Sequence, residues 1–288
     1  MQNKDYTKEE FDKLDKLVLD EGIFHNESEK LLIDDNEVLK IFREKKSDSF
    51  GIKLYTLNGL NERKKSLKTN RIILPNSLIS VNKEIIGYKM NYIKGKNLST
   101  LLKDETVPFE TKLDYLKQIG HIFLELKESI KNNALKDFAL NDVHENNFVV
   151  DEQNRVFVVD IDSAYLEHTA PFGTRYLNSC SATKYAPNKY NTNLTRSFGG
   201  SIIPTHNTDL YCYTIIILNL LYGNNVVHRF SIDNYKAYIE YLKANGLCKE
   251  LEDIFLNIYT ENDNINPIYY LDNLSLVYEN ISSHNKKR

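Results

Sequence analysis

The segment from residue 140 to residue 162 holds the side chains best suited to chemistry. Asp142 begins a D-x-x-x-x-N pattern that ends at Asn147, and Asp160 follows the apolar run Val156–Val159. Phosphoryl transfer needs such a set: one carboxylate orients the proton of the attacking hydroxyl, and oxygen ligands hold magnesium on the nucleotide phosphates. An isolated D-x-x-x-x-N is more often a turn motif. The assignment therefore depends on the elements that position these residues.

Length and composition limit the class of protein. The chain has 288 residues, which suggests two domains or one two-lobed unit at roughly 100–200 residues per domain. Its net charge of −3 does not indicate the excess of basic residues that nucleic-acid-binding proteins usually have. The longest aliphatic run, Thr214–Leu221, is interrupted by Asn219 and is far shorter than a membrane span.

The N-terminus and the cysteines favour a cytoplasmic location. MQNKDYTKEEF has no apolar stretch of the kind found in secretory signals. Cys180, Cys212 and Cys248 are widely spaced and fit neither a disulfide framework nor a metal pattern. We therefore expect a cytoplasmic protein without nucleic-acid or membrane partners.

Hydrophobic periodicity predicts a mostly β half followed by a mostly α half. Thr7 and Glu10 fit a capping box that opens a helix over 7–19. The first half further predicts a hairpin over 31–42, a helix over 48–62, and extended segments at 72–74, 78–81 and 85–90. The second half predicts a helix from Pro108 to about 129, strands at 147–150 and 156–161, an irregular segment over 163–207, and helices over 209–222, 231–245, 248–260 and 268–281. This order predicts an α+β fold with two lobes.

The segment 140–162 resembles the protein-kinase superfamily. Asp142 and Asn147 match the ends of its catalytic loop, H-R-D-x-x-x-x-N, and Asp160 matches the metal-binding aspartate of D-F-G. The resemblance implies that Asp142 is the catalytic aspartate. It also implies that Asn147 and Asp160 bind about two Mg²⁺ ions that ATP brings into the cleft.

Further pieces resemble the same family in the same order. Val38-Leu39-Lys40 resembles V-A-I-K, which implies that Lys40 reaches the α- and β-phosphates. Because Leu39 and Ile41 flank it, Lys40 should point away from them. Asp209-Leu210-Tyr211 resembles the start of a buried helix whose aspartate braces the catalytic loop, and 186–188 (A-P-N) resembles A-P-E.

The stretch after residue 89 resembles the family's gatekeeper and hinge. The resemblance implies that the backbone there pairs with adenine, with Met90, Tyr92 and Ile93 as the cofactor-binding residues. By itself, Met90 is best interpreted as a core residue, and lining of the adenine pocket is its second role. The resemblance covers about residues 20–280 and implies a protein-kinase-like two-lobed fold. Residues 1–19 would form a helical extension, 20–94 a small β-rich N-lobe and 95–288 a larger α-helical C-lobe.

Several positions depart from the family pattern. Leu140-Asn141 replaces the His-Arg before the catalytic aspartate, and Asp160-Ile161-Asp162 replaces D-F-G. Gly22 is the only glycine before the first hairpin, so the glycine-rich loop is nearly absent. Asp162 is expected as a hydrogen-bond acceptor beside the metal. His144 and Asp162 are similar to residues of aminoglycoside and choline phosphotransferases.

The carboxylate partner of Lys40 is the largest departure. Lys53 stands where the family has a helix glutamate, and Glu44, Asp48 or Glu62 could substitute for it. We expect the protein to be an ATP-dependent phosphotransferase that acts on a hydroxyl. The favoured acceptor is Ser or Thr of a protein. The alternatives are a small-molecule phosphotransferase and a pseudokinase that binds nucleotide or serves as a scaffold.

Overall fold

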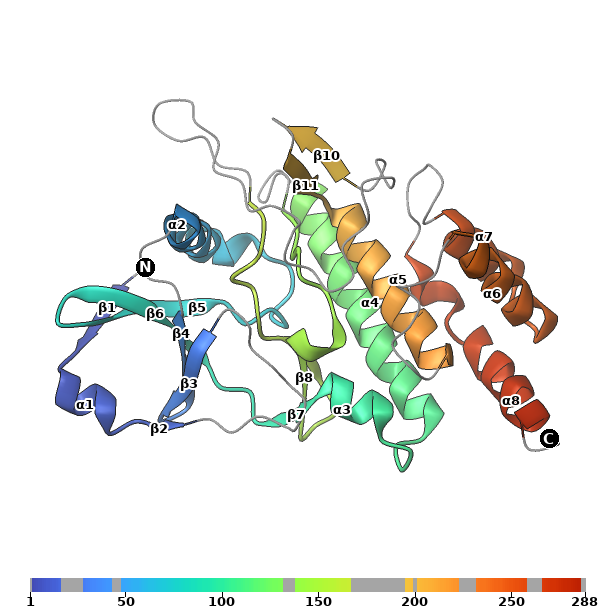
Figure 1. Ribbon diagram of the computed structural model, residues 1–288, viewed down its shortest axis with the longest axis horizontal. Coiled ribbons are helices and arrows are strands. Elements are labelled where there is room, and N and C mark those ends of the chain that lie inside the picture. The colour runs from blue at the N-terminus through green and yellow to red at the C-terminus, as the bar shows by residue number, and fades with distance from the viewer. Residues whose placement is uncertain are drawn as a thin grey trace.

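The computed structural model describes residues 2–16, 28–42, 48–131, 138–166, 195–198, 201–222, 232–257 and 266–285. The fold is α+β, as the hydrophobic periodicity predicts. A strand-rich N-terminal part and a helical C-terminal part lie at opposite ends of the molecule (Figure 1). Among the described helices, none combines the length and the apolar character that crossing a bilayer requires.

Six strands form the main sheet in the order β1-β5-β6-β4-β3-β2. They are β1 (Gln2–Tyr6), β2 (Asp15–Lys16), β3 (Ser28–Asp34), β4 (Glu37–Phe42), β5 (Pro75–Val81) and β6 (Glu84–Asn91). All neighbouring strands pair antiparallel except β1, which pairs parallel with β5. The predicted hairpin over 31–42 and the strands at 78–81 and 85–90 are confirmed. The extended segment at 72–74 contributes an isolated bridge from Ile72 to Val158.

The N-terminal helix is shorter than the predicted helix over 7–19. Helix α1 spans Lys8–Asp12, and the capping box is present: the Thr7 hydroxyl accepts the Glu10 amide, and the Glu10 carboxylate accepts the Thr7 amide. The prediction was wrong over 13–16, because Asp15–Lys16 pairs with β3 instead, and 17–19 lie outside the described residues. The hydrophobic periodicity of a short segment contains no information about a partner strand elsewhere in the sequence.

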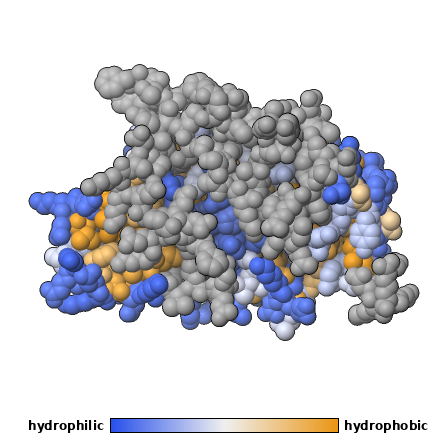
Figure 2. Space-filling view, in the orientation of Figure 1, coloured by the Kyte–Doolittle hydropathy of each residue, from blue (hydrophilic) through white to orange (hydrophobic). Residues whose placement is uncertain are grey.

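Alternating residues of β4 face opposite sides of the main sheet. Leu39 and Ile41 join a buried cluster that contains Phe11 of α1. Phe42 lies on the other side, where its ring contacts that of Phe50 from helix α2 (Asp48–Glu62) at 5.5 Å between centroids. Lys40 shares the side of Phe42, so the prediction that it points away from Leu39 and Ile41 is confirmed. Figure 2 shows hydrophobic residues gathered over this sheet at the left of the view.

The C-terminal part surrounds helix α5 (His206–Tyr222). Its residues are apolar on all sides and almost all of them are buried, as expected of a central helix. Helix α4 (Phe109–Lys131) packs against it, and the Tyr213 hydroxyl donates to the Leu116 carbonyl at 2.7 Å. The other helical segments are α3 (Leu98–Lys103), α6 (Ile232–Ala244), α7 (Lys249–Asn257), η5 (Pro267–Tyr270) and α8 (Asn273–Asn285). The helices predicted from Pro108, over 209–222 and over 231–245 agree within a few residues, and the helix over 248–260 agrees as far as it is described. The helix predicted over 268–281 is divided between η5 and α8, and α3 was not predicted.

A three-stranded sheet joins the two parts. Strands β7 (Gly95–Asn97), β8 (Phe148–Asp151) and β9 (Val156–Val158) pair antiparallel. The β8–β9 hairpin agrees with the sequence prediction, while β7 was not predicted. Within the segment predicted as irregular, β10 (Thr195–Phe198) and β11 (Ser201–Pro204) pair antiparallel.

Candidate functional site

The loop that carries Asp142 is fixed by the carboxylate of Asp209. This side chain accepts the backbone amides of Leu140 at 2.7 Å and of Asn141 at 2.9 Å, and it is 1% exposed. Burial raises the pKa of Asp209 to about 7, although both amides favour the ionised form. This is the position that the resemblance implies for a bracing aspartate.

Asn141 stands where the pattern that the sequence resembles has an arginine. The local structure explains why asparagine suits this position. Its φ angle is +65°, a left-handed conformation that asparagine tolerates better than most residues. Its side-chain amide donates to the Ser163 carbonyl at 2.8 Å, which ties the loop to the segment after β9. The residue is buried. It therefore shapes the loop and presents no cation there.

Asp142 and Asn147 lie against each other at the ends of the loop. The Asn147 side-chain amide donates to the Asp142 carbonyl at 2.8 Å and to Asp142 Oδ2 at 3.1 Å. Asp142 Oδ1 is buried and has no hydrogen-bond partner within the described part of the chain. His144 Nε2 lies 3.5 Å from this oxygen, and its Nδ1 accepts the Asn146 amide at 3.2 Å. The latter bond places the proton of a neutral His144 on Nε2, facing Asp142.

Lys40 forms an ion-pair cluster with the two aspartates that follow β9. Its Nζ lies 2.7 Å from each carboxylate oxygen of Asp160 and 3.0 Å from Asp162 Oδ2. Burial lowers the pKa of Lys40, but the charges of Asp160 and Asp162 outweigh it and raise the pKa well above its usual value. Burial raises the pKa of both carboxyls. The Lys40 ammonium nevertheless holds the pKa of Asp160 below its ordinary value, whereas burial and the charge of Asp160 keep the pKa of Asp162 above it.

Lys53 of α2 completes this cluster, which we call the lysine–aspartate cluster (Lys40, Lys53, Asp160, Asp162). Its Nζ lies 3.8 Å from Asp162 Oδ2 and 5.8 Å from the centre of the Phe42 ring. The carboxylates paired with Lys40 thus come from the segment after β9. Of the proposed substitutes, Glu44 and the side chain of Asp48 lie outside the described residues.

The predicted hinge residues lie at the end of β6 and just after it. Met90 is opposite Val38 in the β4–β6 pairing and is buried. Tyr92 and Ile93 are half-buried and come just after β6, and the Tyr92 amide donates to the Asn36 carbonyl at 2.8 Å. This bond occupies the Tyr92 amide, so adenine pairing would have to use other backbone groups of the segment.

Two residues near the site were not identified from the sequence. Tyr88 is fully buried opposite Lys40 in the β4–β6 pairing, and its hydroxyl has no hydrogen-bond partner among the described residues. Asn97 donates its side-chain amide to the Asn146 carbonyl at 2.7 Å and caps α3. The strand register could have identified Tyr88, whereas a local pattern contains no signal for the contact of Asn97 with the loop.

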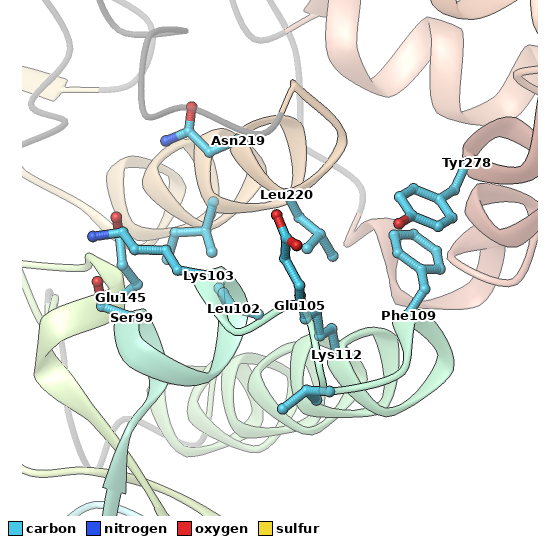
Figure 3. Close-up of a pocket in the computed structure, with 12 residues that line it drawn as sticks. Ser99, Leu102, Lys103, Glu105, Phe109, Lys112, Glu145, Asn219, Leu220 and Tyr278 are labelled. Atoms are coloured by element: carbon cyan, nitrogen blue, oxygen red, sulfur yellow. The ribbon is translucent and has the colours of Figure 1, made fainter. Parts of the chain in front are cut away.

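A cavity of about 650 Å³ lies beside the loop and opens between α3, α4, α5 and α8 (Figure 3). Glu145, which belongs to the short helix η2 (Glu145–Asn147), lines one end together with Ser99 and Lys103. Phe109 and Tyr278 stack at the other end, with ring centres 4.0 Å apart and planes at 6°. The cavity is therefore separate from the lysine–aspartate cluster.

Three features of the sequence fall outside the described part of the chain: the A-P-N segment at 186–188, Cys180 and Gly22. Within the described part, no group of three or more His, Cys, Asp or Glu side chains is arranged to hold a metal ion by itself. Neither the protein-family models nor the curated proteins provide a match to this sequence. The assignment of a function therefore depends on the geometry given above.

Proposed function

We propose that this protein is an ATP-dependent phosphotransferase that moves the γ-phosphoryl group to a hydroxyl, in a protein-kinase-like two-lobed fold. In this proposal, 20–94 form the N-lobe and 95–288 the C-lobe. The observation that carries it is a continuous set of contacts between the three candidate segments. Lys40 contacts Asp160 at 2.7 Å, the amide of the preceding Val159 donates to the Asn147 carbonyl at 3.1 Å, and Asn147 contacts Asp142.

Each residue of this set has a distinct role in the proposal. Asp142 orients the acceptor hydroxyl, since its side chain is 18% exposed at the loop. Lys40 binds the α- and β-phosphates. Asn147 and Asp160 supply oxygens to the metal, which leaves the remaining positions to phosphate and water, the usual situation for magnesium. Bound magnesium would neutralise the charge that develops on the phosphates.

The two ligand residues fit this function, although they do not form a complete metal cage. The Val159–Asn147 backbone bond holds Asn147 beside the residue that precedes Asp160. The Asn147 side-chain nitrogen is engaged with Asp142, which leaves its oxygen to face a cation. Asp160 would have to exchange part of its contact with Lys40 for the metal.

The favoured acceptor is Ser or Thr of a protein. This preference rests on the A-P-N segment at 186–188 and on the Asp209 brace, which both belong to the protein-kinase layout. A small hydroxyl-bearing molecule is the second candidate. It is supported by His144 beside Asp142 and by the second aspartate of Asp160-Ile161-Asp162, which are similar to residues of small-molecule phosphotransferases.

A pseudokinase is the rival from another class. A lysine without a carboxylate partner would favour it. Lys40 instead pairs with Asp160 and Asp162. This arrangement keeps a buried cation at the place where phosphate would bind, which favours nucleotide binding in the proposal.

The experiment compares wild type, Asp142→Ala and the control Asp12→Ala, which removes an exposed carboxylate of α1. Each protein is mixed with magnesium and ATP labelled on its γ-phosphate, together with generic protein substrates or small alcohols. We expect transfer by wild type and the control, and transfer at least about 100-fold slower by Asp142→Ala.

Thermal unfolding with and without Mg-ATP separates binding from catalysis. All three proteins should gain about 2.7 kcal/mol of stability at a nucleotide concentration 100 times Kd. A shift without transfer to any acceptor would support a nucleotide-binding module. Equal transfer by wild type and Asp142→Ala would contradict the proposed role of Asp142, and no shift at all would support a scaffold.

A further inference from the structure

Asp162 lies between two lysines from different elements. Its Oδ2 is 3.0 Å from Lys40 Nζ on β4 and 3.8 Å from Lys53 Nζ on α2. The side chains of Asp162 and Lys40 are each 3% exposed, and that of Lys53 is 16% exposed. A buried ammonium is retained only with a charged partner. Asp162 is therefore more than a surface carboxylate near the site.

If the proposed function holds, Asp160 would share its carboxylate between Lys40 and a metal ion. Both of its oxygens contact Lys40 here, and binding a metal would draw at least one of them away. Asp162 would then remain as a carboxylate that holds Lys40. Ile161, between the two aspartates, is fully buried, which anchors the segment and keeps Asp162 in place.

The cluster changes only the helix side of the pairing between strand and helix that the resemblance implies, because the strand keeps its lysine, Lys40. The helix contributes a lysine, Lys53, and the carboxylate comes from the segment after β9. The ion-pair connection from Lys40 to α2 is still complete, because Asp162 contacts both lysines. Asp162 stands where the family pattern has glycine, and Lys53 stands where it has glutamate. The contact between the two side chains explains both differences.

We infer that Asp162 is the positioning residue of Lys40 and that Lys53 ties this carboxylate to helix α2. The catalytic consequence rests on the proposed function, while the ion-pair connection itself does not. Displacement of α2 would remove Lys53 from Asp162 and loosen the hold on Lys40.

The first test needs no nucleotide. The unfolding equilibrium is measured for wild type, Lys53→Met, Asp162→Asn and the double variant. If the pair is connected, the double variant should be less destabilised than the sum of the single variants predicts, with a coupling of about fivefold in the unfolding constant. Strictly additive effects would overturn the connection of Asp162 to α2.

The second test measures Mg-ATP affinity. Asp162→Asn should weaken binding about tenfold or more, and Lys53→Glu in the same background should restore it to within about threefold, since the helix then supplies the carboxylate. Lys64→Glu in that background is the control, because it reverses an exposed charge just after α2 and should restore nothing. Equal affinity of wild type and Asp162→Asn, or equal rescue by Lys64→Glu, would overturn the positioning role.

Two further comparisons keep the results distinct. If Asp162→Asn does not fold, Lys53→Met is tested alone, because Lys53 is the least buried of the three side chains. It should weaken Mg-ATP binding about threefold. Unchanged affinity would overturn the inference. If wild type binds no Mg-ATP, the proposed function fails. The nucleotide-free cycle then decides the ion-pair connection by itself.

Discussion

The backbone amide of Asn141 donates a 2.9 Å hydrogen bond to the carboxylate of Asp209, which lies 68 residues further along the chain. The other oxygen of the same carboxylate accepts the Leu140 amide. Asn141 adopts a left-handed backbone conformation directly before Asp142. The central helix α5 thus sets the direction in which the loop enters the candidate site.

Asp209→Asn tests this bracing role. The substituted amide keeps one oxygen, so one of the two buried backbone amides loses its acceptor at a cost of about 2 kcal/mol. At pH 8, where the Asp209 carboxyl is ionised, we expect the melting temperature to fall by roughly 4–8 °C. Thermal unfolding followed by circular dichroism measures the change.

The control for this variant is Asp253→Asn on α7. Its carboxylate is 53% exposed and pairs with an exposed lysine, so its loss should change stability by less than about 1 kcal/mol. Similar melting temperatures for Asp209→Asn and Asp253→Asn would show that the two amide bonds contribute little to the stability of the loop.

Local patterns predicted most of the elements that carry the site. Alternation around Lys40 placed it on the face opposite Leu39 and Ile41, and that orientation is what brings it to the segment after β9. The apolar run before Asp160 predicted strand β9, although the strand ends at Val158 and not at 161. Such features depend on neighbours in the sequence, which is why periodicity detects them.

Features that depend on distant partners were not predictable in this way. The pairing of Asp15–Lys16 with β3 ended the N-terminal helix early, and β1 entered the sheet through a partner strand more than 70 residues away. The sequence placed Lys53 where a glutamate was expected but left its partner open. Only the fold brings Asp162 to Lys53, because the two residues are far apart in the sequence.

Gly87 gives a second prediction, because the strand that carries Lys40 passes very close to it. A Cβ atom at Gly87 would lie 2.1 Å from the Lys40 carbonyl oxygen, so Gly87→Ala must push β6 and β4 apart. We expect a loss of about 3 kcal/mol in the free energy of unfolding. Denaturant unfolding measures this loss.

Gly51→Ala is the matched control for Gly87→Ala. Gly51 lies in helix α2, and a Cβ there meets no described atom within 4 Å. The substitution should leave stability unchanged or raise it by up to about 1 kcal/mol, since alanine favours a helix over glycine. Equal effects of the two variants would contradict the close approach of β6 to Lys40.

His206 provides a prediction for the dependence of stability on pH. Its Nδ1 is buried without a hydrogen-bond partner in the described part of the chain, and its ring lies edge-on to Phe123. Burial lowers the pKa of His206 to about 4, with a smaller contribution from Lys127. An unfolded histidine titrates near 6.5, so the unfolded state binds a proton first as the pH falls. The stability that the neutral ring provides is therefore present above pH 6.5 and is lost between about pH 6.5 and 4.

The variant His206→Phe should remove this dependence while keeping the contact with Phe123. Between pH 7.5 and pH 5, wild type should lose about 2 kcal/mol more than the variant in the free energy of unfolding. Urea unfolding at both pH values measures the difference. His121→Gln alters an exposed histidine of α4 and serves as the control, which should follow wild type because that side chain meets water in both states. If His206→Phe also follows wild type, the buried ring is not the source of acid sensitivity.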